Sequence, residues 1–145
     1  FWGDASGNFL MDALIELGVA EPNTEHPRLL SVRIANAVAC LPPKNRPSPS
    51  EIKQCGTEWL KIELARFPYR VCLGKVAHES VRRLIGLSPK EMPFSHGGLT
   101  TLDRGFVLSS YHPSPLNTQT GRLNQAEFNA LIRRALFMAE RTLLG

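Results

Sequence analysis

The chain has 145 residues, 43% of them apolar and 21% charged, with a formal net charge of +4. These values are typical of one globular domain with a sizeable core, and the positive charge allows a nucleic-acid partner without requiring one. No apolar run is long enough to span a membrane and no signal peptide is visible. Three cysteines at irregular spacing argue against a secreted disulfide framework and favour a reduced, cytoplasmic setting, in which a metal or a cluster can also be bound.

The first part of the chain is predicted to hold one helix and one strand. Apolar residues at helical spacing predict a helix over residues 5–18, with Gly18 at its end. Polar residues and two prolines indicate a loop over 19–30. Apolar and polar side chains then alternate, which predicts a strand over 31–39. Because the chain opens on a helix, we expect that a first strand and its loop precede Phe1 in the natural protein.

Helices and strands alternate along the rest of the chain. The sequence 48–51 (Ser-Pro-Ser-Glu) is typical of a helix start. The helix that follows is expected to bury one face, formed by Ile52, Cys55, Trp59 and Ile62. Further on we expect a strand over 69–74, a helix over 75–85 ending at Gly86, a connection over 87–104, a strand over 105–110 and a last helix capped by Asn124.

This alternation predicts the α/β class, as a three-layer α/β/α sandwich with a short, mainly parallel central sheet and a single domain over residues 1–145. In such sheets, ligands bind beyond the carboxyl ends of the strands. The predicted strand over 105–110 ends at such a place, because His112-Pro113-Ser114-Pro115 follows it closely. The two prolines stiffen this loop, which carries an imidazole and a hydroxyl. The residue types alone leave two interpretations open, an exposed turn or a functional site.

Two further polar residues lie close to predicted element ends. Asn36 falls on the inward side of the alternation with Val32 and Ile34. A buried amide there either bonds the edge of a bound base or is satisfied by a neighbouring loop. Asp4 directly precedes the first predicted helix, where an aspartate is an ordinary N-cap.

The cysteines and the basic loop residues give weaker signals. Cys40 and Cys55 lack the spacing of a zinc knuckle, and two thiolates are too few for an iron–sulfur cluster. Cys72, in the middle of a predicted strand, is most simply a small buried apolar residue, although as a nucleophile it would define a cysteine-dependent hydrolase. A solvated surface or phosphate contacts would each explain the basic loop residues Lys44, Arg46, Arg104 and Arg122.

Four sequence blocks, in order, resemble the uracil-DNA glycosylase superfamily and within it the type B (family 5) enzymes. The blocks are 1–7 (Phe-Trp-Gly-Asp-Ala-Ser-Gly), 36–55, 70–78 and 110–123. In the last block, the extension Asn-Thr-Gln-Thr-Gly-Arg after His-Pro-Ser-Pro-Leu distinguishes family 5 from family 4. The resemblance covers nearly the whole chain.

The resemblance implies a role for each matching residue. Asp4 would activate or position the attacking water, and His112 would stabilise the charge that builds on the departing base. Phe1 would stack on the flipped base, and Asn36 would bond its edge. The residues implied to contact DNA are Ser114, Pro115, Leu116 and Arg122. Cys40 and Cys55 would be two of the four ligands of a [4Fe–4S] cluster, with the other two expected upstream of this chain.

The resemblance further implies an enzyme of base-excision repair. It would hydrolyse the N-glycosidic bond of uracil in DNA, with other deaminated bases as further candidates, and would act as a cytoplasmic monomer without a membrane partner. The alternative is a non-catalytic nucleic-acid-binding relative with the same fold. Loss of uracil release in Asp4→Ala and His112→Ala, with DNA binding retained, would support the enzyme.

Overall fold

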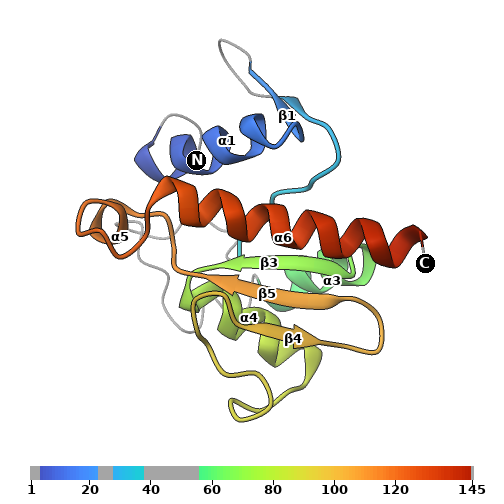
Figure 1. Ribbon diagram of the computed structural model, residues 1–145. Coiled ribbons are helices and arrows are strands. Elements are labelled where there is room, and N and C mark those ends of the chain that lie inside the picture. The colour runs from blue at the N-terminus through green and yellow to red at the C-terminus, as the bar shows by residue number, and fades with distance from the viewer. Residues whose placement is uncertain (1–3, 23–27, 38–55, 145) are drawn as a thin grey trace. The chain divides into compact units, whose positions relative to one another are not determined.

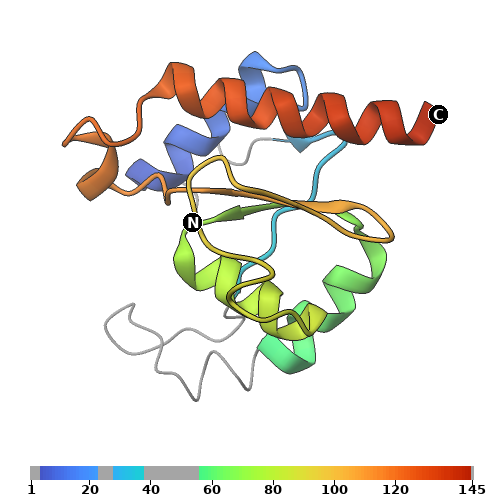
Figure 2. The ribbon, with the colours of Figure 1, turned by 60° about the horizontal axis from the view of Figure 1, so that its bottom comes forward.

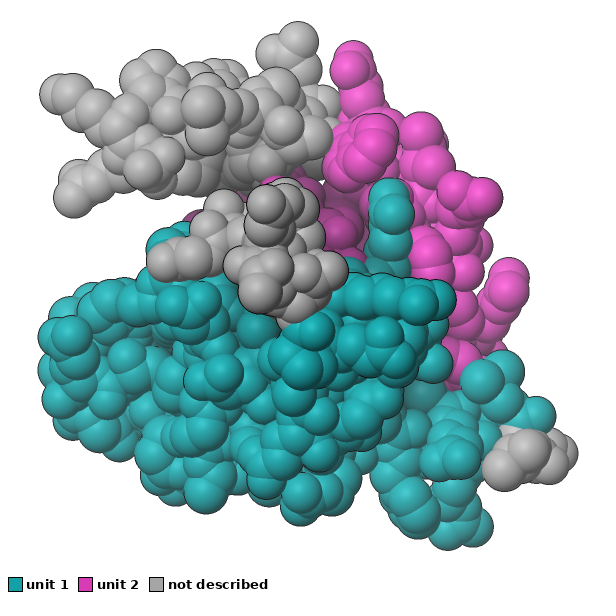
Figure 3. Space-filling model, turned by 90° about the horizontal axis from the view of Figure 1, so that it is seen from above, with its two compact units in different colours: residues 1–33, 110–145 teal, residues 34–109 magenta. Residues whose placement is uncertain are grey.

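The computed structural model describes residues 4–22, 28–37 and 56–144 (Figure 1). The chain divides into two compact units, which Figure 3 shows in different colours. One comprises residues 1–33 and 110–145, and the other comprises residues 34–109. The expected α/β class is confirmed, because helices alternate along the chain with the strands of a small sheet.

The first unit is built on two helices, α1 (Ala5–Glu16) and α6 (Gln125–Leu144), which pack against each other. Their contact includes the rings of Phe9 and Phe128, whose centroids lie 5.2 Å apart. The apolar spacing that predicted both helices provides this core, with buried side chains at Leu10, Met11, Leu14, Phe128, Leu131 and Ile132. The predicted cap of α6 is also confirmed, because Asn124 Oδ1 accepts a hydrogen bond of 2.8 Å from the Glu127 amide.

The segment predicted as a loop over residues 19–30 contains two short strands. β1 (Ala20–Glu21) pairs antiparallel with β2 (Arg28–Leu29). Ala20 is buried, which anchors this ribbon to α1. Strands of two residues are too short to show an alternating pattern, so the sequence did not reveal them.

The second unit contains the main sheet and the helices that cover one of its faces (Figure 2). Its strands are β3 (Tyr69–Leu73), β5 (Phe106–Ser110) and β4 (Leu99–Thr101), in that spatial order. Figure 1 shows β3 and β5 pointing the same way, whereas β4 pairs antiparallel with β5. The sheet is therefore mixed, with one parallel and one antiparallel pair. The strands predicted near 69–74 and 105–110 are confirmed.

The helices of this unit are α3 (Lys61–Arg66) and α4 (Lys75–Ile85), with a π-helical turn, η2 (Gly56–Leu60), before α3. The predicted helix over 75–85 is confirmed, and Gly86 ends it with a φ of 88°. The apolar core of the unit unites η2, the sheet and α4 through Leu60, Cys72, Val81, Met92 and Val107.

Two predictions for this part of the chain are wrong. Residues 31–37 form no strand, and 38–39 lie outside the described residues. Half-buried Val32 and Ile34 keep the alternation, but a strand also needs a hydrogen-bonded neighbour, which side-chain pattern does not supply. The connection over 87–104 contains β4, whose three residues are too few to show a period.

The prediction of which face is buried in the helix after residue 51 is also wrong for the two of its residues that the structure describes. Trp59 and Ile62 are 46% and 56% exposed, whereas Leu60 and Glu63 are buried. Ile52 and Cys55 lie outside the described residues. The buried face is displaced by one residue from the predicted one, because Leu60 rather than Trp59 packs into the core with Cys72 and Val81.

Gly105 is required by the turn that joins β4 to β5. Its φ is +89°, and a Cβ atom there would lie 1.9 Å from the carbonyl oxygen of Pro68. We therefore expect Gly105→Ala to lower the free energy of unfolding by about 3 kcal/mol or more in urea titrations, since backbone atoms have to move. Gly97→Ala is the matched control, with a φ of +79° and open space around the added atom. It should cost only about 1 kcal/mol, and equal losses would contradict the steric argument.

Candidate active site

The loop after β5 carries the residues singled out by the sequence. Tyr111 and His112 follow the strand directly, Pro113 is buried, and the short helix α5 (Pro115–Thr118) begins after Ser114. Ser114 has extended backbone angles, as expected for a residue before proline, and Pro115 occupies the first helical position. The two prolines therefore define the path of the loop, as predicted.

Hydrogen bonds within the loop add to this stiffness. The side-chain amide of Asn117 donates to the carbonyl oxygen of His112 at 2.8 Å. The backbone carbonyl of Asn117 accepts from the amide of buried Leu123 at 3.0 Å. Thr118 Oγ1 donates to the Ser114 carbonyl at 3.2 Å. The sequence alone assigned no role to Asn117, because an asparagine after Pro-Leu does not by itself indicate which carbonyl it will reach.

Asp4 is the N-cap of α1. Its Oδ1 atom accepts a hydrogen bond of 2.6 Å from the amide of Gly7, which confirms the capping interpretation. The residue is exposed, so capping leaves the carboxylate at the surface and is compatible with a second role.

Asp4 and His112 belong to the same unit, and their charges interact. Loss of hydration around part of the His112 ring lowers its pKa below 6.5, although the residue remains exposed, and the Asp4 carboxylate acts in the opposite direction. Near neutral pH the ring is therefore mostly uncharged. An uncharged imidazole offers one N–H donor and one acceptor nitrogen.

The other predicted site residues are distributed differently. Asn36 is exposed and lies in an irregular segment of the second unit, so the expectation of a buried amide on a strand is wrong. Ser114 is half-buried, while Pro115 and Leu116 are exposed. The remaining predicted residues lie outside the described part of the chain: Phe1, Cys40, Lys44, Arg46 and Cys55.

Arg122 lies at the far end of the loop and contacts Tyr111. The guanidinium carbon lies 5.8 Å from the centroid of the Tyr111 ring, within the range of a cation–π interaction. Leu116, between them in the sequence, is 73% exposed. The loop thus presents an apolar side chain to solvent on a hydrogen-bonded framework.

Cys72 is a core residue of β3. It is 3% exposed, and burial raises the pKa of its thiol to about 12, against the opposing effect of Arg70. Because the thiolate is the reactive form, this thiol is unreactive at neutral pH. The structure therefore contradicts the interpretation of Cys72 as the nucleophile of a hydrolase.

A buried histidine that no sequence motif singled out holds the end of the sheet. His78 on α4 bonds the Ser109 hydroxyl through Nδ1 at 2.7 Å, and its Nε2 donates to the Met92 carbonyl at 2.9 Å. Its ring also contacts Phe94 edge-on, with centroids 5.2 Å apart. These bonds use both ring nitrogens in the core, so His78 supports β5 rather than binding a ligand.

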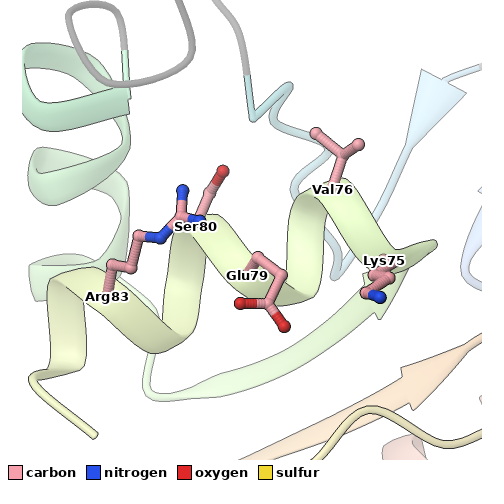
Figure 4. Close-up of a pocket in the computed structure, with 5 residues that line it drawn as sticks. All are labelled: Lys75, Val76, Glu79, Ser80 and Arg83. Atoms are coloured by element: carbon pink, nitrogen blue, oxygen red, sulfur yellow. The ribbon is translucent and has the colours of Figure 1, made fainter. Parts of the chain in front are cut away.

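The described residues offer few other candidate sites. A surface hollow of about 260 Å³ lies on α4, lined by the five residues that Figure 4 shows: Lys75, Val76, Glu79, Ser80 and Arg83. Arg82 bonds Glu79 at 2.5 Å and holds its pKa below the usual range, so this carboxylate is already paired. Across the described ranges, no group of three or more His, Cys, Asp or Glu side chains is placed to hold a metal. No described helix is both long and apolar enough to cross a membrane.

Comparison with known proteins identifies the family of this chain. Residues 1–136 match the family model described as the uracil DNA glycosylase superfamily, and the chain belongs to this superfamily. This confirms the resemblance stated from the four sequence blocks.

The individual relatives share a narrower name than the superfamily, type-5 uracil-DNA glycosylase. The chain is 40% identical over 147 residues to the type-5 uracil-DNA glycosylase of Thermus thermophilus, covering 96% of this chain and 67% of that protein. It is 38% identical over 142 residues to the type-5 enzyme of Pyrobaculum aerophilum, covering 93% and 62%. For the type-5 enzyme of Mycobacterium tuberculosis the identity is 37% over 150 residues, covering 96% and 56%. The chain thus spans between 56% and 67% of the length of these relatives.

Proposed function

We propose that this chain excises uracil from DNA by hydrolysing the N-glycosidic bond. One observation carries the proposal: in a member of the uracil DNA glycosylase superfamily, one compact unit holds both the N-cap carboxylate Asp4 and the imidazole of His112, which follows β5. The names of the relatives support uracil as the base. Other deaminated bases remain part of the proposal as further substrates.

The proposed reaction assigns different charges to the two residues. Cleavage of the bond between the sugar and the base leaves electrons on the base and positive charge on the sugar. An N–H of His112 donates to the base oxygen on which negative charge develops, and this bond strengthens as the reaction proceeds. Asp4 stabilises the sugar cation and orients the water whose oxygen attacks C1′. Water supplies the hydroxyl to the sugar and a proton to the departing base.

The base has to leave the helical stack before this chemistry can occur. We propose that Ser114, Pro115, Leu116 and Arg122 form the surface of the loop that faces DNA, with Leu116 entering the space left by the base. Phe1 and Asn36 are proposed to hold the flipped base by stacking and by hydrogen bonding. The exposure of Leu116, on a loop held by internal bonds, supports this assignment.

Leu116→Ala tests the insertion of this side chain. We expect uracil release from a paired duplex to fall by about tenfold, because part of the few kcal/mol that unstacking costs is no longer offset. Release from single-stranded DNA should change by less than about twofold, since no duplex has to be opened. Leu143→Ala is the matched control, because Leu143 is 74% exposed at the end of α6. Equal losses on both substrates would argue against insertion.

We also propose that the protein binds a [4Fe–4S] cluster through Cys40 and Cys55, as the resemblance implies. No step of the proposed reaction depends on this cluster. The described residues do not include these two cysteines, so the fit of a cluster is a question for spectroscopy. An absorbance near 400 nm after anaerobic purification would support it, and a colourless protein would exclude it.

The assay that tests the proposed function is a single-turnover measurement on duplex DNA with one uracil. Release by the wild type, lost in His112 and Asp4 variants that still bind DNA, is the expected result. Equal and negligible release by all of them, with DNA binding retained, would instead support the non-catalytic nucleic-acid-binding relative. We propose a monomeric, cytoplasmic enzyme of one domain over residues 1–145.

A further inference from the structure

The loop that carries His112 and Leu116 is closed at its base by a side-chain contact. The Arg122 guanidinium lies over the Tyr111 ring at 5.8 Å, joining the first residue after β5 to the residue just before buried Leu123. Both proposed functional parts of the loop, His112 and Leu116, lie between these two residues.

The contact complements the hydrogen bonds inside the loop. Those bonds hold His112 to Asn117 and Asn117 to Leu123. These bonds determine the shape of the loop. The contact between the Arg122 guanidinium and the Tyr111 ring, called the stack below, joins the first residue of the loop to its last part. Closing a loop at its base restricts the conformations that it samples, so less order has to be created when a ligand binds.

We propose that Tyr111 is a positioning residue, whose ring beneath Arg122 closes the base of the loop so that His112 and Leu116 meet DNA in one arrangement. The inference rests on the proposed uracil excision, because it assigns Tyr111 a part in that reaction. It also refines the role of Arg122, which acts on the loop through Tyr111 in addition to any attraction of its charge for DNA. Tyr111 itself touches no reacting atom in this proposal.

The experiment compares Tyr111→Leu, Arg122→Met and the double variant. An exposed cation–π contact of this kind corresponds to about two- to fivefold in an equilibrium. The amides of Gln119 and Leu123 donate to the carbonyls of Pro115 and Asn117 inside the loop. We expect their hydrogen exchange to speed up by this factor in each single variant, and uracil release from duplex DNA to slow by at least this factor. In exchange, the double variant should lose no more than either single variant, because both remove the same contact. In uracil release it should lose no more than Arg122→Met, which also removes a charge proposed to face DNA.

Two control variants separate positioning from general stability. Tyr111→Phe keeps the ring and should retain the wild-type exchange and release rates within about twofold. Arg141→Met removes a comparable pair, since Arg141 lies 5.7 Å from the Phe137 ring on α6. It should leave loop exchange and uracil release unchanged. Tyr111→Leu removes no charge, so the salt dependence of DNA affinity should stay as in the wild type.

Several outcomes would overturn the inference. They are wild-type loop exchange in Tyr111→Leu, additive losses in the double variant, or equal losses in Tyr111→Phe and Tyr111→Leu. A loss in Arg122→Met alone, with a weaker salt dependence, would make Arg122 a phosphate contact only. If the wild type releases no uracil, the proposed function fails, whereas the exchange measurements still decide whether the stack closes the loop.

Discussion

We expect His112→Ala to lower the single-turnover rate of uracil release by about 10²–10³-fold, which is the usual cost of removing a donor aimed at developing negative charge. Affinity for uracil-containing DNA should change by less than about threefold, because the charge on the base develops only during cleavage. His112→Gln keeps an N–H donor and should recover part of the lost rate. The measurement is uracil release with enzyme in excess of DNA, alongside binding to a non-cleavable duplex.

The same residue gives a pH-dependent effect on stability. Because the pKa of His112 is lowered in the folded protein, the unfolded chain binds the proton more strongly. Its contribution to stability is complete above pH 6.5 and is lost as the pH falls from there through the folded pKa. Urea titrations between pH 7 and pH 5 should therefore show a larger loss of unfolding free energy in the wild type than in His112→Gln. Parallel curves for the two proteins would contradict the lowered pKa.

The second large effect is expected at Asp4, where two variants separate capping from catalysis. Asparagine caps a helix as well as aspartate does, so Asp4→Asn should keep the free energy of unfolding within about 0.5 kcal/mol. Asp4→Ala should lower it by about 1 kcal/mol because the bond to Gly7 is lost. Both variants should release uracil about 10²-fold more slowly or worse, since both remove the carboxylate that orients water and stabilises the sugar cation.

A titration of His112 by NMR adds a readout that does not depend on activity. The Asp4 charge raises the pKa of His112, so both Asp4 variants should lower that pKa further. If Asp4→Asn instead kept wild-type release, the carboxylate would be only a helix cap. If release were lost while the His112 pKa stayed the same, Asp4 would act on the substrate without an electrostatic interaction with His112.

Local signals predicted the elements that are long enough to show a period. The helices predicted from the apolar spacing of α1 and α6, the glycine after α4 and the strand β5 are all confirmed. The short strands β1, β2 and β4 were not predicted, because two or three residues are too few to show an alternating pattern. Their strand conformation depends on hydrogen bonds to the strand with which each one pairs. The prediction of a strand over 31–39 was wrong for the opposite reason. The alternation of side chains is present, but residues 31–37 form no strand.

The His-Pro-Ser-Pro loop shows where the sequence sufficed for the candidate site. Its prolines, its serine before α5 and its histidine after β5 could be placed from residue order alone, because proline geometry is local. The motifs around Asp4 and His112 were also enough to indicate the superfamily, which the comparison confirms.

The sequence by itself thus determined the α/β class, the family and the residue types available for chemistry. Only the tertiary structure decided which of them interact: that the Asp4 charge acts on His112, that the Tyr111 ring lies beneath Arg122, and that Cys72 is buried and unreactive. Backbone preferences act over a few residues, whereas hydration and charge interactions depend on atoms brought together from distant positions in the chain.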